Sequence, residues 1–302
     1  MDSMDNTPPR DNRTIAGSIL IAALIIGAAV YLKKPPAPAP DTGLSGDGAG
    51  QRQTAALPLA PVTLPVVLGD IGARLVSVGV IDKAKFEELY RARGGLSEEE
   101  KRFLYGENPE KLVLTSSNAS FLLNLFWALG LGQKSSVLEN GPISDPRYGG
   151  AGGFASTGGW TVGRGDVMSH FSKHRFFALT GDQEALVAKV AKGVFRPCCN
   201  NSAYFPDCNH GMAMLGLLEL AASQGASEEE LWKTALAANR FWFPDAYQTI
   251  ENTLRLAGRD PAAVPPKELV GAAFVSASGY RRIIEEGAGS AGTGGGGGGC
   301  SV

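Results

Sequence analysis

The chain has 302 residues, with 28 lysines and arginines against 30 aspartates and glutamates, and its formal net charge is −2. This balance excludes the broadly basic surface of a general nucleic-acid-binding protein, so we expect no nucleic-acid partner. Apolar residues make up 44% of the chain and aromatic residues 8%, which excludes a wholly disordered protein. Residues 1–63 and 286–302 are an apolar stretch and low-complexity sequence, which leaves residues 64–285 as a single folded domain.

An uncharged stretch of 19 residues, 14–32, follows a short N-terminal tail formed by residues 1–13. As a helix this stretch would measure about 28 Å, which is enough to cross the hydrocarbon core of a bilayer. We therefore expect a single-pass transmembrane anchor whose partner is the lipid bilayer. A cleavable signal peptide is the main alternative, although its apolar part is normally only about 7 to 15 residues long. A buried helix of a soluble protein is a further alternative, but the stretch has no amphipathic stripe.

Residues 33–63 are rich in proline and then in glycine, which predicts a disordered linker between the anchor and the folded domain. The charges that flank the anchor are nearly balanced, with Arg10 and Arg13 before it and Lys33 and Lys34 after it. Signal anchors of this form usually export the long C-terminal part. We therefore expect the N-terminus inside the cytoplasmic membrane and the folded domain on its extracytoplasmic side, while the opposite orientation stays open.

Helix signals dominate residues 64–285, which predicts a mainly α fold. Ser97 and Ser227 each stand three residues before a glutamate, so each is expected to cap the start of a helix. Asp70 and Asp82 are expected to open a short helical pair.

Further helices are expected where an apolar run follows a start signal. These runs are 117–130, which is too short to be a second membrane span, 182–192, 205–225 and 243–257. Only residues 111–115 and 272–276 show the alternation of apolar and polar residues that is typical of a strand.

Residues 149–165 contain eight glycines and no sustained apolar period, which predicts a Gly-rich loop. Because this loop directly precedes His170, we expect it to cover a site, with Trp160 as its apolar contact. An anion-binding role is the alternative, but the loop lacks the Lys-Ser/Thr ending of a phosphate-binding loop.

The chain has three histidines and four cysteines, and all of them except Cys300 lie between residues 170 and 210. His170 and His174 are spaced i, i+4, so they would share one face of a helix that starts at Asp166.

The remaining residues of this group follow with the spacing Cys-Cys-x8-Cys-x-His, which matches no standard zinc finger. Thiolates and imidazoles suit Zn²⁺ first, and Cu or Fe next. We therefore predict a transition-metal site. Its ligands would be Cys198, Cys199, Cys208 and His210, with His170 and His174 completing or lining the site.

A thiol-dependent enzyme or thiol–disulfide protein is the first alternative to a metal site. Cys208 is expected in the first turn of a helix that Asp207 caps, where unpaired N–H groups lower the pKa of a thiol. His210 is expected to point elsewhere on that helix, so the catalytic base would be His170 or His174.

A structural surface domain is the second alternative. In an extracytoplasmic domain, Cys198 or Cys199 would form a disulfide with Cys208 that staples the turn between them. The thiol left over would then be free to pair with Cys300, in the disordered Gly-rich tail of residues 286–302, to bind a metal or to react. The sequence alone does not choose between these interpretations.

Overall fold

The computed structural model describes residues 59–290, and the side chains of residues 59–285. The expected N-terminal tail, transmembrane anchor, most of the linker and Cys300 lie outside the described residues. Within residues 59–290, no helix is both long enough and apolar enough to cross a membrane.

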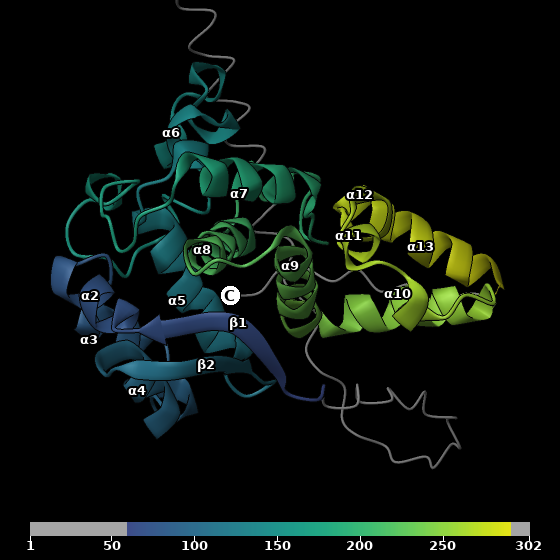
Figure 1. Ribbon diagram of the computed structural model, residues 1–302, viewed down its shortest axis with the longest axis horizontal. Helices are drawn as coiled ribbons and strands as arrows, with labels where there is room; N and C mark the ends of the chain where they lie inside the picture. The colour runs from purple at the N-terminus through teal and green to yellow at the C-terminus, as the bar shows by residue number, and fades with distance from the viewer. Residues whose placement is uncertain (1–58, 291–302) are drawn as a thin grey trace, which may run out of the picture. The chain divides into compact units, whose positions relative to one another are not determined.

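Helices take up 58% of residues 59–286 and strands 8%, which confirms the mainly α fold (Figure 1). In chain order the elements are β1 (Val62–Gly69), α2 (Ile71–Val78), α3 (Lys83–Glu88), α4 (Glu98–Tyr105), β2 (Asn108–Leu114), α5 (Ala119–Gly132), α6 (Ser136–Asn140), α7 (Gly181–Gly193), α8 (Asn209–Ser223), α9 (Glu228–Trp242), α10 (Pro244–Leu256), α11 (Pro266–Leu269), α12 (Ala272–Val275) and α13 (Ala277–Ser290). Short 3-10 helices are η1 (Arg91–Arg93), η2 (Pro142–Ser144), η3 (Pro146–Tyr148), η4 (Ala151–Gly153), η5 (Val167–Ser169) and η6 (Pro261–Ala263).

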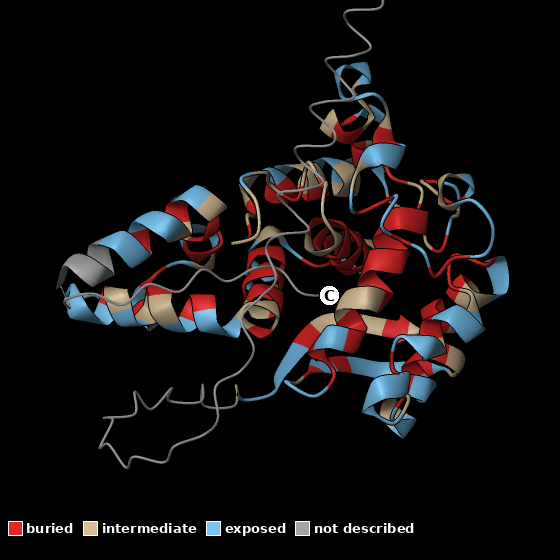
Figure 2. Cartoon of the chain, turned by 180° about the vertical axis from the view of Figure 1, so that it is seen from behind, coloured by how far each residue is buried: buried red, intermediate tan, exposed pale blue. Residues whose placement is uncertain are grey.

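Helices α5 and α8 form the centre of the core, and α8 also packs against α7 and α9 (Figure 1). Both central helices are buried along most of their length, as Figure 2 shows. They come close together because glycines face each other at the contact. A Cβ on Gly130 would lie 2.1 Å from the carbonyl oxygen of Met212, and one on Gly216 would lie 2.6 Å from the Gly130 nitrogen.

The capping signals predict helix starts correctly. Ser97 and Ser227 each form a capping box with the glutamate three residues later. The side chain of Asp82 caps α3, but the α-helix ends at Glu88 and the chain continues as η1. The expected helices at 117–130, 182–192 and 243–257 are present as α5, α7 and α10.

The two strands of the structure agree with the strand predictions only in part. β1 and β2 pair antiparallel, with Val62 opposite Leu114. The prediction for 111–115 is thus confirmed in β2, whereas β1 was not predicted and begins two residues inside the expected linker. Residues 272–275, within the strand expected at 272–276, form the helix α12 and not a strand. These four residues are all apolar, and so short an apolar run does not tell a strand from one helical turn.

The expected helix from Asp166 through the two histidines is wrong. Asp166 caps a single 3-10 turn, and Ser172 then takes a left-handed backbone conformation, with φ 51°. The N–H groups of Ser172 and His174 donate to the carbonyl oxygens of Leu131 and Gly132 at the end of α5, over 2.9 and 2.8 Å. Contacts with another helix therefore replace the local hydrogen bonds of the predicted one.

Residues 149–165 form a loop of turns with the single short helix η4, as predicted. The indole of Trp160 is buried and donates a hydrogen bond to the carbonyl oxygen of Val80 over 2.7 Å. The Ser156 N–H donates to the carbonyl oxygen of Asp207 over 3.1 Å, which ties the loop to the start of α8.

Candidate functional site

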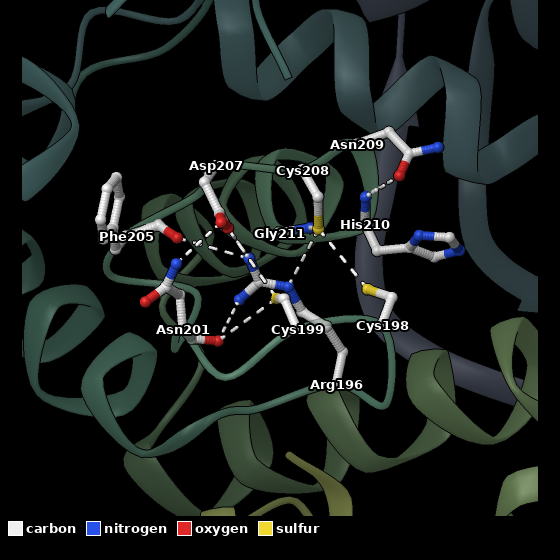
Figure 3. Close-up of polar contacts among 10 residues, drawn as sticks. All are labelled: Arg196, Cys198, Cys199, Asn201, Phe205, Asp207, Cys208, Asn209, His210 and Gly211. Atoms are coloured by element: carbon white, nitrogen blue, oxygen red, sulfur yellow. Dashed lines mark hydrogen bonds and ion pairs between the residues drawn. The ribbon is translucent and has the colours of Figure 1, made fainter. Parts of the chain in front are cut away.

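Three thiols gather where the segment between α7 and α8 folds back on itself (Figure 3). Cys198 and Cys199 lie in this segment, and an isolated bridge pairs Cys199 with Arg196. Cys208 occupies the N-cap position of α8, one place earlier than predicted, and its sulfur accepts the Gly211 N–H over 3.4 Å. The three cysteines in this described segment are free thiols.

Arg196 is the buried charge that organises this segment, and it is only 1% exposed. Its Nε donates to Cys208 Sγ over 3.2 Å and its Nη2 to Asp207 Oδ1 over 2.7 Å. Its Nη1 donates to the carbonyl oxygen of Asn201 over 2.7 Å. Arg196 was not predicted as part of the site, because nothing in the sequence around it marks an arginine as buried.

The sulfur atoms of Cys198 and Cys208 lie 3.6 Å apart. Two ligands that bind one tetrahedral Zn²⁺ through bonds of about 2.3 Å stand about 3.8 Å apart, so this spacing fits a shared ion. Cys199 lies on the other side of Cys208. Its Sγ is 3.7 Å from the carbonyl oxygen of Asn201 and 3.8 Å from Asp207 Oδ1.

The pKa of Cys208 is lowered far below that of a free thiol. The neighbouring thiols of Cys198 and Cys199 are the largest causes; burial opposes them, and His210 and the positive charge of Arg196 add smaller effects in the same direction as the thiols. The pKa of Cys198 is raised by the neighbouring sulfurs of Cys199 and Cys208 and by burial. Of these two thiols, Cys208 is thus the one whose surroundings favour the thiolate form.

His210 belongs to the cluster, contrary to the expectation that it points elsewhere on the helix. One of its ring nitrogens lies within 4.8 Å of the sulfurs of both Cys198 and Cys208. Because Cys208 is the N-cap, His210 stands at the second helical position, where side chains lean back toward the helix start. Its ring packs on Phe243 with a centroid distance of 4.4 Å, and its Nδ1 is buried without a hydrogen-bond partner.

The described residues thus contain two overlapping groups that are near enough to bind a metal ion. One group is Cys198, Cys208 and His210, and the other is Cys199, Asp207 and Cys208. In the second group both carboxylate oxygens of Asp207 are already paired, Oδ1 with Arg196 and Oδ2 with the Asn201 amide over 2.7 Å. The first group is therefore the better donor set.

His170 and His174 lie together in the segment that follows η5, and neither belongs to the two groups. His170 Nδ1 is 3.0 Å from His174 Nε2, and His170 Nε2 is 2.9 Å from the carbonyl oxygen of Arg164. Burial, followed by the neighbouring His170, lowers the pKa of His174. The two imidazoles thus contact each other, and their predicted role as metal ligands stays a prediction.

A cavity of about 650 Å³ opens beside the thiols, and Cys198 and Cys208 form part of its wall. The Gly-rich loop supplies five more lining residues, Ala155, Gly159, Trp160, Thr161 and Val162. The loop predicted to lie over a site thus borders the same space as two of the predicted ligands.

Comparison of the chain with models of protein families, with curated proteins and with solved structures found no match. The site chemistry therefore carries the functional argument alone.

Proposed function

We propose that this protein binds a transition-metal ion through Cys198, Cys208 and His210, with Zn²⁺ as the first expectation and Cu or Fe as alternatives. The observation that carries the proposal is a pair of sulfurs 3.6 Å apart beside an imidazole whose buried Nδ1 has no partner. Buried polar atoms are nearly always paired, so an unpaired imidazole nitrogen on a ring of this cluster fits a cation as the missing partner.

The fourth coordination position would face the cavity. Zinc sites that act on a substrate commonly keep three protein ligands and one open position. Because Cys198 and Cys208 line the cavity, an ion between them would be accessible from it. Cys199 would then stand beside the ion without binding it. Arg196 would balance the negative charge of the thiolates through its contact with Cys208.

We further propose that residues 14–32 anchor the protein in the cytoplasmic membrane, with the metal-binding domain on the extracytoplasmic side. The support is the uncharged stretch of 19 residues and the Pro-rich and Gly-rich sequence that follows it. Protease accessibility of the domain in intact cells tests the orientation.

Elemental analysis of the full chain, stripped of metal and then reloaded with Zn²⁺, tests the metal site. We expect about one equivalent of bound metal, lost in Cys208→Ser and strongly reduced in His210→Ala. Cys300→Ser is the matched control and should keep its metal. Equal metal content in Cys208→Ser and Cys300→Ser would overturn the proposal.

A reactive thiolate at Cys208 is the second candidate, and the 3.2 Å contact from Arg196 Nε favours it. The nearby base would be His210, not His170 or His174 as the sequence predicts. If Cys208 is a reactive thiolate, we expect the protein to bind no metal. We also expect Cys208 to be alkylated well before Cys198 and Cys199 at neutral pH. Iodoacetamide labelling followed by peptide mass spectrometry separates the two candidates.

A further inference from the structure

We propose that the cavity beside Cys198 and Cys208 is the binding site for an uncharged, flat aromatic molecule that carries a carbonyl or hydroxyl group. Its volume, about 650 Å³, lies within the usual range for small-molecule sites. The position of the ligand next to an open metal coordination site rests on the proposed function. The binding itself depends on the cavity walls and does not require the metal.

Two largely buried tryptophans form a rigid apolar part of the cavity wall. Trp127 and Trp160 meet edge to face with ring centroids 4.8 Å apart. Trp127 Nε1 donates to the Ser156 carbonyl oxygen over 2.6 Å, and Trp160 Nε1 donates to Val80. Trp127 is 7% exposed and Trp160 is 3% exposed, and because both N–H groups are used inside the protein, the small part of each ring that reaches the cavity is apolar. Fixed ring edges of this kind pack against a planar apolar group without a further loss of side-chain freedom.

The charge of the walls excludes strongly charged ligands. Among the described residues that line the cavity, Arg93 alone is a base or a carboxylic acid. Its guanidinium pairs with Glu100 over 2.6 Å and lies over the ring of Tyr90, 4.4 Å from the centroid. The charge of Arg93 is thus already neutralised by Glu100. A phosphate or carboxylate in the cavity would lose its hydration without gaining a free cation.

Two amides supply the polar contacts that would orient the ligand. Asn124 Nδ2 donates to the hydroxyl of Tyr90 over 2.9 Å, and its carbonyl oxygen is the group left for a ligand hydroxyl. Asn209 Oδ1 accepts the His210 N–H over 2.9 Å, so its amide N–H groups are left for a ligand carbonyl. A few polar groups in an apolar cavity are the usual means of fixing the orientation of an aromatic ligand.

Isothermal titration calorimetry with two probes of the same shape tests the proposal. The probes are 2-acetylnaphthalene, which is neutral, and 2-naphthoate, which is anionic. Both are titrated into the full chain in detergent after removal of metal. We expect the neutral ketone to bind at least about tenfold more tightly than the carboxylate. Equal affinities would overturn the assignment to an uncharged ligand.

Variants at the cavity separate binding there from uptake by the detergent. Ser120→Phe and Thr161→Phe each place a ring in the cavity from an exposed position, and we expect each to weaken ketone binding at least about tenfold. Ser116→Phe is the matched control, because Ser116 is exposed in the turn before α5 and does not line the cavity. Its affinity should stay within about twofold of the unmodified chain. Circular dichroism checks that all three variants fold.

The outcomes distinguish this proposal from the metal site. Ketone binding that neither Ser120→Phe nor Thr161→Phe weakens would overturn the cavity as the binding site. A chain that takes up metal but binds no ketone would overturn the cavity proposal and leave the metal site standing. A chain that binds the ketone but takes up no metal would overturn the metal site and leave the cavity proposal standing.

Discussion

A Cβ atom on residue 211 would lie only 2.4 Å from Nη2 of Arg196, so Gly211 is what allows the guanidinium to fit against the first turn of α8. Moving the guanidinium aside would be unfavourable, because it is buried and donates hydrogen bonds to Cys208, Asp207 and Asn201 at the same time. The fit between a buried arginine and a missing side chain thus sets the position of the Cys208 sulfur.

Gly211→Ala should therefore destabilise the protein. We expect the free energy of unfolding to fall by about 2 kcal/mol, because the added methyl group forces the guanidinium off its acceptors. Urea unfolding followed by circular dichroism measures the change. Gly181→Ala is the matched control, since Gly181 lies in the first turn of α7 with nothing within 4 Å of its added Cβ. An equal loss in both variants would contradict the steric argument.

Arg196→Met should lower the free energy of unfolding by about 3 kcal/mol, more than Gly211→Ala, because it removes a buried charge and leaves Asp207 without its partner. The double variant Arg196→Met with Asp207→Asn removes both charges, and we expect it to recover part of the loss. A double-mutant cycle on the free energy of unfolding measures the coupling between the two residues. If the two single losses simply add, the ion pair does not contribute as the structure implies.

Local sequence signals predicted the helix starts, because both partners of a cap lie in one turn. Ser97 and Ser227 each bond to a residue three positions away, and the sequence shows both partners. The cysteine cluster was also predictable in part, since Cys198, Cys208 and His210 lie within thirteen residues of one another. One turn followed by one helix start is enough to bring these three residues together.

Features that depend on distant partners could not be predicted. The helix expected at His170 and His174 is absent because carbonyl oxygens at the end of α5 accept their segment's N–H groups. Strand β1 was missed because Val67 and Pro65 break its alternation, and its register is set by β2. Its Val67 N–H and carbonyl both pair with the side chain of Gln224, 157 positions away.

The contact between α5 and α8 predicts that Gly130→Ala destabilises the core. The added Cβ would lie 2.1 Å from the Met212 carbonyl oxygen, so the two helices must separate. We expect a loss of about 3 kcal/mol in the free energy of unfolding. Thermal denaturation of Gly130→Ala beside the Gly181→Ala control measures it. An unchanged melting temperature would show that the helices do not approach as closely as the structure has them.

Glu219 predicts how stability depends on pH. Its side chain is buried in α8, and burial raises its pKa from 4.5 to about 8, with the Ser135 hydroxyl opposing this shift and Glu184 adding to it. Between these two values the folded state holds a proton that the unfolded state has lost. The contribution of Glu219 to stability should therefore be greatest below pH 4.5 and fall by up to about 1.4 kcal/mol per pH unit as the pH rises toward 8.

Glu219→Gln cannot ionise, so it should lose this part of the pH dependence and gain stability relative to the unmodified chain as the pH rises. Urea unfolding of both chains at several values from about pH 5 to about pH 8 measures the difference in slope. Glu229→Gln, at a position where the side chain is 75% exposed, is the matched control and should keep the slope of the unmodified chain. Parallel curves for Glu219→Gln and the unmodified chain would mean that Glu219 is already ionised in the folded protein.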